Sequence, residues 1–77
     1  MSFTLLQKII ADALNINQED VVPEADLSSD LGADSLDAAE LMMTIEDSFK
    51  ISISDNDAQK LKTVGDIWTF IESCAKQ

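Results

Sequence analysis

The stretch "DLGADSLD" at residues 30–37 places one serine, Ser35, between two aspartates and just before an apolar run. A serine nucleophile needs a base that accepts its proton, and this base is usually a histidine. The chain has no histidine, and its five basic residues are all lysines, of which Lys50 is nearest in the sequence. We therefore expect that Ser35 either begins a helix or is modified by another protein.

The start of a helix is a favourable place for a phosphate ester on Ser35. The first helical turn has unpaired N–H groups and the positive end of the helix dipole, which both favour an anion. The carboxylates of Asp34 and Asp37 oppose a phosphate, so affinity for a free anion does not account for the arrangement. A separate enzyme would therefore have to attach the phosphate ester. On spacing alone, the favoured alternative is that Ser35 is an unmodified serine at the start of a helix.

Acidic residues dominate the first two thirds of the chain. The formal net charge is −10, and residues 9–49 hold eleven of the fifteen acids and no lysine. Nucleic acid and anionic lipid are therefore excluded as partners, because both need positive charge opposite them. A basic protein surface is a suitable partner, although the same composition is also typical of a solubilising surface.

The size and composition indicate one small domain, residues 1–77, expected to be monomeric and cytoplasmic. At 77 residues and 45% apolar content, the chain is long enough to form one core. The single cysteine, Cys74, cannot form an internal disulfide, and we expect it to be a small buried hydrophobe. No signal sequence or long apolar segment predicts a membrane span.

Apolar residues recur at helical spacing over most of the chain. This pattern predicts helices at residues 3–14, 35–49 and 55–61, and a fourth that opens at Thr63. The prediction is an all-α fold: a small four-helix bundle with three longer helices, one short helix and a long first loop. Asp34 should cap the second helix, with Asp37 completing a capping box.

The connection at residues 15–34 contains Pro23 and Gly32 and shows no sustained period. A loop of this length in a small domain is usually functional or held by its own side chains. Four apolar residues can hold it in this way: Val21, Val22, Leu27 and Leu31.

One long stretch, "PEADLSSDLGADSLDAAELMMTIEDSFKISISDNDAQKLKTVGDI", resembles the acyl carrier proteins of type II fatty acid synthesis. The resemblance implies that Ser35, between Asp34 and Leu36, carries 4′-phosphopantetheine derived from coenzyme A. A separate phosphopantetheinyl transferase attaches this arm, so the chain itself is not an enzyme. An arm of roughly 20 Å lets its terminal thiol carry an acyl thioester into partner active sites.

The resemblance also implies that the acidic second helix docks on basic patches of fatty acid synthesis enzymes. The matching positions are Asp34, Leu36, Asp37, Glu40, Met43, Glu46, Asp47 and Asp55. The third helix departs from the family pattern, because Asn56 and Gln59 are neutral and Lys60 and Lys62 add positive charge.

The resemblance further implies that growing acyl chains lie between the second and third helices. The lining positions are Leu41, Met42, Ile45, Ile53, Ala58, Leu61, Ile67 and Phe70. Trp68 is bulkier than the aliphatic residue common there, and we expect it to limit the depth of the cavity.

Two other interpretations remain open. One is a discrete carrier for polyketide, peptide or other specialised acyl chemistry, and the other is an acidic helical adaptor without a prosthetic group. No metal site is expected, because Asp55 and Asp57 resemble a calcium loop but Lys60 stands where that loop needs glycine.

Overall fold

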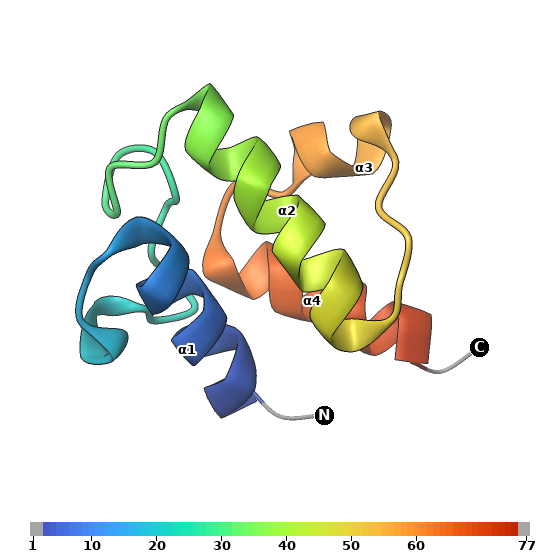
Figure 1. Cartoon of the computed structure of the whole chain (residues 1–77), viewed down its shortest axis with the longest axis horizontal. Helices are drawn as coiled ribbons and strands as arrows, with labels where there is room; N and C mark the ends of the chain where they lie inside the picture. The colour runs from blue at the N-terminus through green and yellow to red at the C-terminus, as the bar shows by residue number, and fades with distance from the viewer. Residues whose placement is uncertain (1–2, 76–77) are drawn as a thin grey trace.

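The computed structural model describes residues 3–75, which form four α-helices and no strand (Figure 1). The helices are α1 (Phe3–Leu14), α2 (Ser35–Phe49), α3 (Asp55–Lys60) and α4 (Val64–Ala75), with a short 3-10 turn, η1 (Gln18–Asp20), in the first loop. The all-α prediction of three longer helices and one short helix is confirmed. The third helix ends one residue earlier than predicted.

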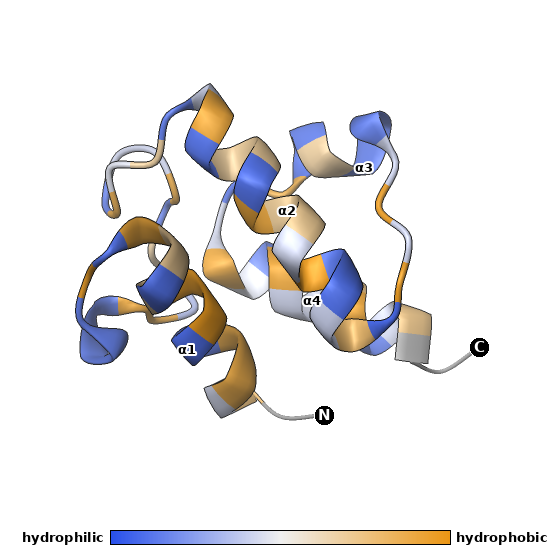
Figure 2. Ribbon diagram, in the orientation of Figure 1, coloured by the Kyte–Doolittle hydropathy of each residue, from blue (hydrophilic) through white to orange (hydrophobic). Residues whose placement is uncertain are grey.

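The three longer helices bury their apolar stripes in one core. α1 and α2 lie side by side and run in opposite directions, with α4 packed behind them (Figure 1). Each of these helices carries apolar and polar residues together, as amphipathic helices do (Figure 2). The largest fully buried side chains are Leu6 and Ile10 of α1, Leu41 and Ile45 of α2, Val64, Ile67 and Ile71 of α4, and Val21 of the first loop.

Backbone hydrogen bonds hold the long first loop against the start of α4. The N–H of Leu27 donates to the carbonyl of Lys62 at 2.9 Å, and the N–H of Val64 donates to the carbonyl of Ala25 at 3.1 Å. Ala25 and Leu27 are buried beneath these bonds. The loop therefore keeps a fixed path, because its backbone groups are paired and its apolar side chains are in the core.

Only part of the predicted set of loop anchors is correct. Val21 and Leu27 are buried and Leu31 is half-buried, but Val22 is 39% exposed. The chain turns tightly at Val21 (φ −87°, ψ 84°), where the N–H of Val22 donates to the carbonyl of Asp20 at 3.1 Å, and this turn leaves Val21 in the core and Val22 at the surface.

The start of α4 and its packing differ in detail from the predictions. Thr63 is the cap: its Oγ1 accepts from the N–H of Asp66 at 3.1 Å, and the helix begins at Val64. Cys74 is half-buried rather than buried. Trp68 packs edge to face on Phe3 with ring centroids 5.6 Å apart, which places it between α4 and α1.

The connection between α2 and α3 is held by Glu46. Its Oε2 accepts from the N–H of Ile53 at 2.8 Å, and α2 ends at Lys50, which has a left-handed φ of 58°. This bond links the last turns of α2 to the chain that leads into α3. It fixes how far α3 stands from α2.

We predict that Val21→Ala lowers the free energy of unfolding by about 2 kcal/mol, because it removes fully buried methyl groups. The adjacent Val22→Ala should cost less, about 1 kcal/mol or below, since Val22 is 39% exposed and buries less apolar surface than Val21. Urea unfolding of the two variants measures both values. Equal losses would contradict the assigned burial of the loop.

Candidate functional site

Ser35 is exposed and is the first residue of α2. A capping box holds this helix start. Asp34 Oδ1 accepts from the N–H of Asp37 at 2.8 Å, and Asp37 Oδ2 accepts from the N–H of Asp34 at 3.3 Å. The predicted capping box is confirmed, and it fixes the backbone on both sides of Ser35.

The hydroxyl of Ser35 makes no hydrogen bond within residues 3–75. The side chain of Asp34 accepts from the N–H of Asp37, and its backbone carbonyl accepts from the N–H of Ala38 at 2.9 Å. The N–H groups of Ser35 and Leu36 have no acceptor in the same part of the chain. Two free donors therefore lie beside the hydroxyl, an arrangement that suits a phosphate ester.

Two hollows lie on either side of Ser35. One, of about 610 Å³, lies between α2 and α3, and we call it the α2–α3 groove. The other, of about 620 Å³, lies toward the first loop, and we call it the loop hollow. Ser35, Ala38 and Leu61 line both. A group attached to Ser35 thus has room on two sides.

The structure brings half of the predicted acyl-pocket residues to the α2–α3 groove. Met42, Ile53, Ala58 and Leu61 line it. The side chains of three others, Leu41, Ile45 and Ile67, lie fully buried in the core instead. Phe70 lines a separate hollow of about 370 Å³, and Trp68 is not among the residues that line the groove.

The groove also includes residues that the sequence reasoning assigned only to docking. Met43, Glu46 and Asp55 line it together with Ala39 and Gln59. The opening of the groove therefore adjoins the acidic surface of α2. Helical spacing contains the signal for Ala39 and Met43, since Ala39 lies one turn after Ser35 and Met43 one turn after Ala39 on the same side of α2.

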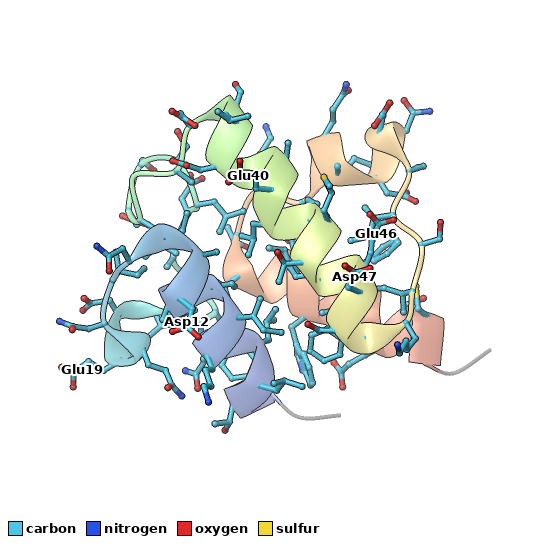
Figure 3. All side chains as sticks on the ribbon, in the orientation of Figure 1. Asp12, Glu19, Glu40, Glu46 and Asp47 are labelled. Atoms are coloured by element: carbon cyan, nitrogen blue, oxygen red, sulfur yellow. The ribbon has the colours of Figure 1, made fainter. Side chains whose placement is uncertain are left out.

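Four of the predicted docking residues form one exposed stripe along α2: Leu36, Glu40, Met43 and Asp47. They recur every three or four residues, which places them on one face. Leu36 and Met43 are 67% and 64% exposed. Figure 3 shows Glu40 and Asp47 on this helix, with Asp12 on α1 and Glu19 on η1. We call this set the α2 stripe.

The other predicted docking residues have different environments. Asp37 belongs to the capping box, and the half-buried Glu46 accepts a hydrogen bond from the N–H of Ile53. Asp55 is exposed in the first turn of α3, where Ser54 caps the helix through the N–H of Asp57 at 3.1 Å.

Asp26 lies on the wall of the loop hollow, where its charge is stabilised. Its Oδ1 accepts from the N–H groups of Ser28 at 2.9 Å and Ser29 at 3.0 Å. The bonds from Ser29 and then Ser28 hold the pKa of the Asp26 carboxyl below its ordinary value, and the positive charge of Lys62 lowers this pKa further.

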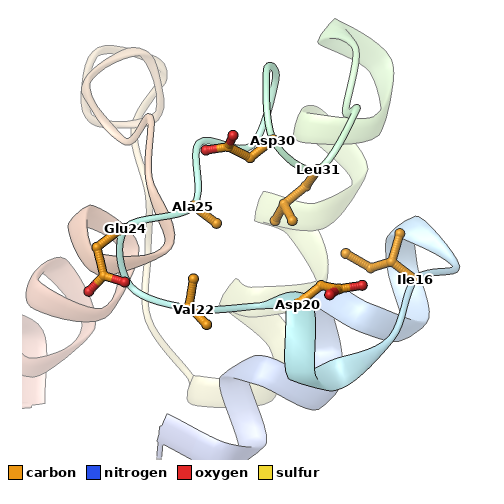
Figure 4. Close-up of a pocket in the computed structure, with 7 residues that line it drawn as sticks. All are labelled: Ile16, Asp20, Val22, Glu24, Ala25, Asp30 and Leu31. Atoms are coloured by element: carbon orange, nitrogen blue, oxygen red, sulfur yellow. The ribbon is translucent and has the colours of Figure 1, made fainter.

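A third hollow, of about 410 Å³, is formed by the first loop at a distance from Ser35 (Figure 4). Asp20, Glu24 and Asp30 lie around it, with Ile16 and Val22 among its apolar residues. Across residues 3–75 there is no group of three or more His, Cys, Asp or Glu side chains placed to hold a metal ion. No helix in this range is long and apolar enough to cross a membrane.

Comparisons with known proteins agree with this geometry. The family model described as the phosphopantetheine attachment site matches residues 4–71. A solved structure from Mycobacterium tuberculosis, assigned as an acyl carrier protein, has 34% identity and a TM-score of 0.85, and the match covers 94% of this chain and 97% of that one. An acyl carrier protein from Enterococcus faecalis has 35% identity and a TM-score of 0.79, with 94% and 91% covered.

Members of this family carry a 4′-phosphopantetheine prosthetic group and act as carriers rather than enzymes. The free hydroxyl, the two free N–H groups and the flanking hollows at Ser35 fit such a group. The chain belongs to the acyl carrier proteins, the family with a phosphopantetheine attachment site.

Proposed function

We propose that Ser35 is the attachment residue and that the chain delivers acyl intermediates to the enzymes of fatty acid synthesis. The observation that carries the proposal is the exposed Ser35 hydroxyl, which has no partner in the described chain and lies between two hollows. When bound, the 4′-phosphopantetheine group supplies a thiol that holds the acyl chain as a thioester.

The attachment needs a separate enzyme. The Ser35 oxygen forms a bond to the pantetheine-linked phosphorus of coenzyme A, and the bond from that phosphorus to the nucleotide phosphate breaks. Adenosine 3′,5′-bisphosphate leaves, and the serine proton passes to a base of the transferase. The chain has no histidine to accept this proton, so a phosphopantetheinyl transferase must supply the base.

The α2–α3 groove is the proposed shelter for the acyl chain. Met42, Ile53, Ala58 and Leu61 give it apolar walls that begin beside Ser35. Met42 is unbranched and adaptable, so the groove can fit chains of different length at modest cost. This narrower set replaces the eight positions expected from the sequence.

The α2 stripe is the proposed docking surface for basic partners. Glu40 and Asp47 attract positive charge, and the exposed Leu36 and Met43 add apolar contact on the same face. Such an interface associates fast and dissociates fast, which suits a carrier that visits several enzymes. We propose that the carrier works in the cytoplasm as a single-domain monomer.

We predict that incubation with coenzyme A, Mg²⁺ and a phosphopantetheinyl transferase adds the mass of one 4′-phosphopantetheine group. The Ser35→Ala variant should gain nothing, because it lacks the accepting oxygen. Ser29→Ala removes a hydroxyl from the loop hollow, which Ser35 also lines, and this variant should be modified like the wild type. Intact-protein mass spectrometry gives the answer, and an unmodified wild-type chain would refute the attachment.

We predict that Glu40→Lys lowers kcat/KM of the transferase about tenfold at low ionic strength, because it places a like charge opposite a basic partner. Glu19→Lys changes the net charge equally but lies on η1, and it should have little effect. The difference in kcat/KM between the two variants should vanish near 1 M salt, where the Debye length is about 3 Å. Equal effects of both variants would count against the α2 stripe.

Loading tests separate fatty acid synthesis from specialised acyl chemistry. The holo protein should accept a malonyl group and support repeated elongation by a reconstituted set of type II fatty acid synthesis enzymes. The apolar groove can shelter each product, so chain length should increase over successive cycles. Mass spectrometry of the loaded carrier measures this increase in chain length. A holo protein that is never elongated would instead indicate a carrier for polyketide or peptide chemistry.

A further inference from the structure

One cation stands at the rim of the loop hollow. Of the residues that line this hollow, Lys62 is the single basic one, and Asp26, Asp34 and Ser35 are among the others. The Lys62 side chain is exposed and forms no ion pair with a carboxylate within residues 3–75. Its positive charge lowers the pKa of the Asp26 carboxyl on the same hollow, but no ion pair within residues 3–75 occupies the ammonium group.

The backbone of Lys62 is fixed on both sides. Its N–H donates to Asp66 Oδ2 at 3.2 Å, and its carbonyl accepts from the N–H of Leu27 at 2.9 Å. The next residue, Thr63, pairs with Asp26 in an isolated antiparallel bridge. The ammonium group therefore moves on a flexible four-carbon stem, but from an anchored point beside the hollow.

A phosphodiester at Ser35 needs a positive charge of this kind. The free N–H groups of Ser35 and Leu36 offer two donors, but the carboxylates of Asp34 and Asp37 lie in the same turn and repel an anion. No lysine lies on α2 itself, so a cation must come from another segment. The path of the first loop against the start of α4 brings Lys62 to that position.

The loop hollow has apolar walls beside its polar residues. Leu27, Ala33, Ala38 and Leu61 contribute to its walls, and it begins at Ser35. The segment that follows the phosphate in 4′-phosphopantetheine is a carbon chain with two methyl groups. The hollow therefore offers a cation for the phosphate and an apolar surface for the carbons next to it.

We propose that Lys62 binds the phosphodiester of a 4′-phosphopantetheine arm on Ser35 and holds the first part of the arm in the loop hollow. This inference rests on the proposed attachment at Ser35. It assigns the two hollows different occupants: the loop hollow takes the base of the arm, and the α2–α3 groove is left for the acyl chain. Lys62 is a positioning residue in this arrangement, since the thioester lies at the far end of the arm.

The test compares the ³¹P NMR signal of the holo protein with that of Lys62→Gln. The phosphodiester signal should move toward its position in urea-unfolded holo protein when Lys62 is replaced. Amide shifts of Leu27, Ala33 and Leu61 that arise on conversion from apo to holo protein should fall by about half. Lys62→Arg keeps the charge and should retain most of both effects.

Lys60→Gln is the matched control. It removes the same charge two residues away, but Lys60 lines the hollow that contains Phe70 and not the loop hollow. Its holo spectra should match the wild type. Identical phosphorus and amide signals in wild type and Lys62→Gln would overturn the inference, as would equal changes in both glutamine variants. Mass spectrometry of each sample shows the arm attached, so a failure of attachment is recognised separately.

Discussion

The hydrogen bonds between the first loop and the start of α4 determine where the residues around Ser35 lie. The N–H of Gly65 donates to the carbonyl of Pro23 at 2.9 Å, and a Cβ on Gly65 would stand only 3.0 Å from that oxygen. The close approach therefore depends on glycine. Farther along, the N–H of Ala33 bonds the carbonyl of Leu27 at 2.8 Å, which sets the direction in which α2 begins. The tip of α2 consequently lies beside the chain between α3 and α4.

The carboxylates of this acidic chain divide into two groups. Asp26, Glu46 and Asp66 accept hydrogen bonds from backbone N–H groups of loops and helix starts, so they hold local structure in place. Glu40 and Asp47 make no such bond in the described chain and stay exposed to solvent. Backbone donors can stabilise many negative charges without lysine partners. This leaves the exposed carboxylates of α2 available to basic partners and sensitive to salt.

Helical periodicity was enough to predict the helices, and the spacing of Asp34 and Asp37 was enough to predict the capping box. These features depend on residues close in sequence, such as Asp34 with Asp37, and local patterns report them well. The separation of Val21 from Val22 was not predicted, because both are apolar and only the path of the loop decides which is buried. Likewise, Leu41 and Met42 are neighbours on α2, yet only Met42 lines the groove. Packing against α3 and α4 decides this, and such contacts join segments far apart in the sequence.

Several features around Ser35 are unfavourable for stability alone. Leu36 and Met43 expose most of their surface, more than the other large hydrophobic side chains within residues 3–75, and the Ser35 hydroxyl makes no hydrogen bond in that range. Elsewhere the described chain leaves no buried polar side-chain atom unpaired. Local departures from good packing and pairing concentrate where a protein binds something else. Each of these groups gains a partner if an arm is attached at Ser35 and a basic surface docks on α2. The exposure of Leu36 and Met43 beside Ser35 thus supports the proposed site independently of the sequence motif around the serine.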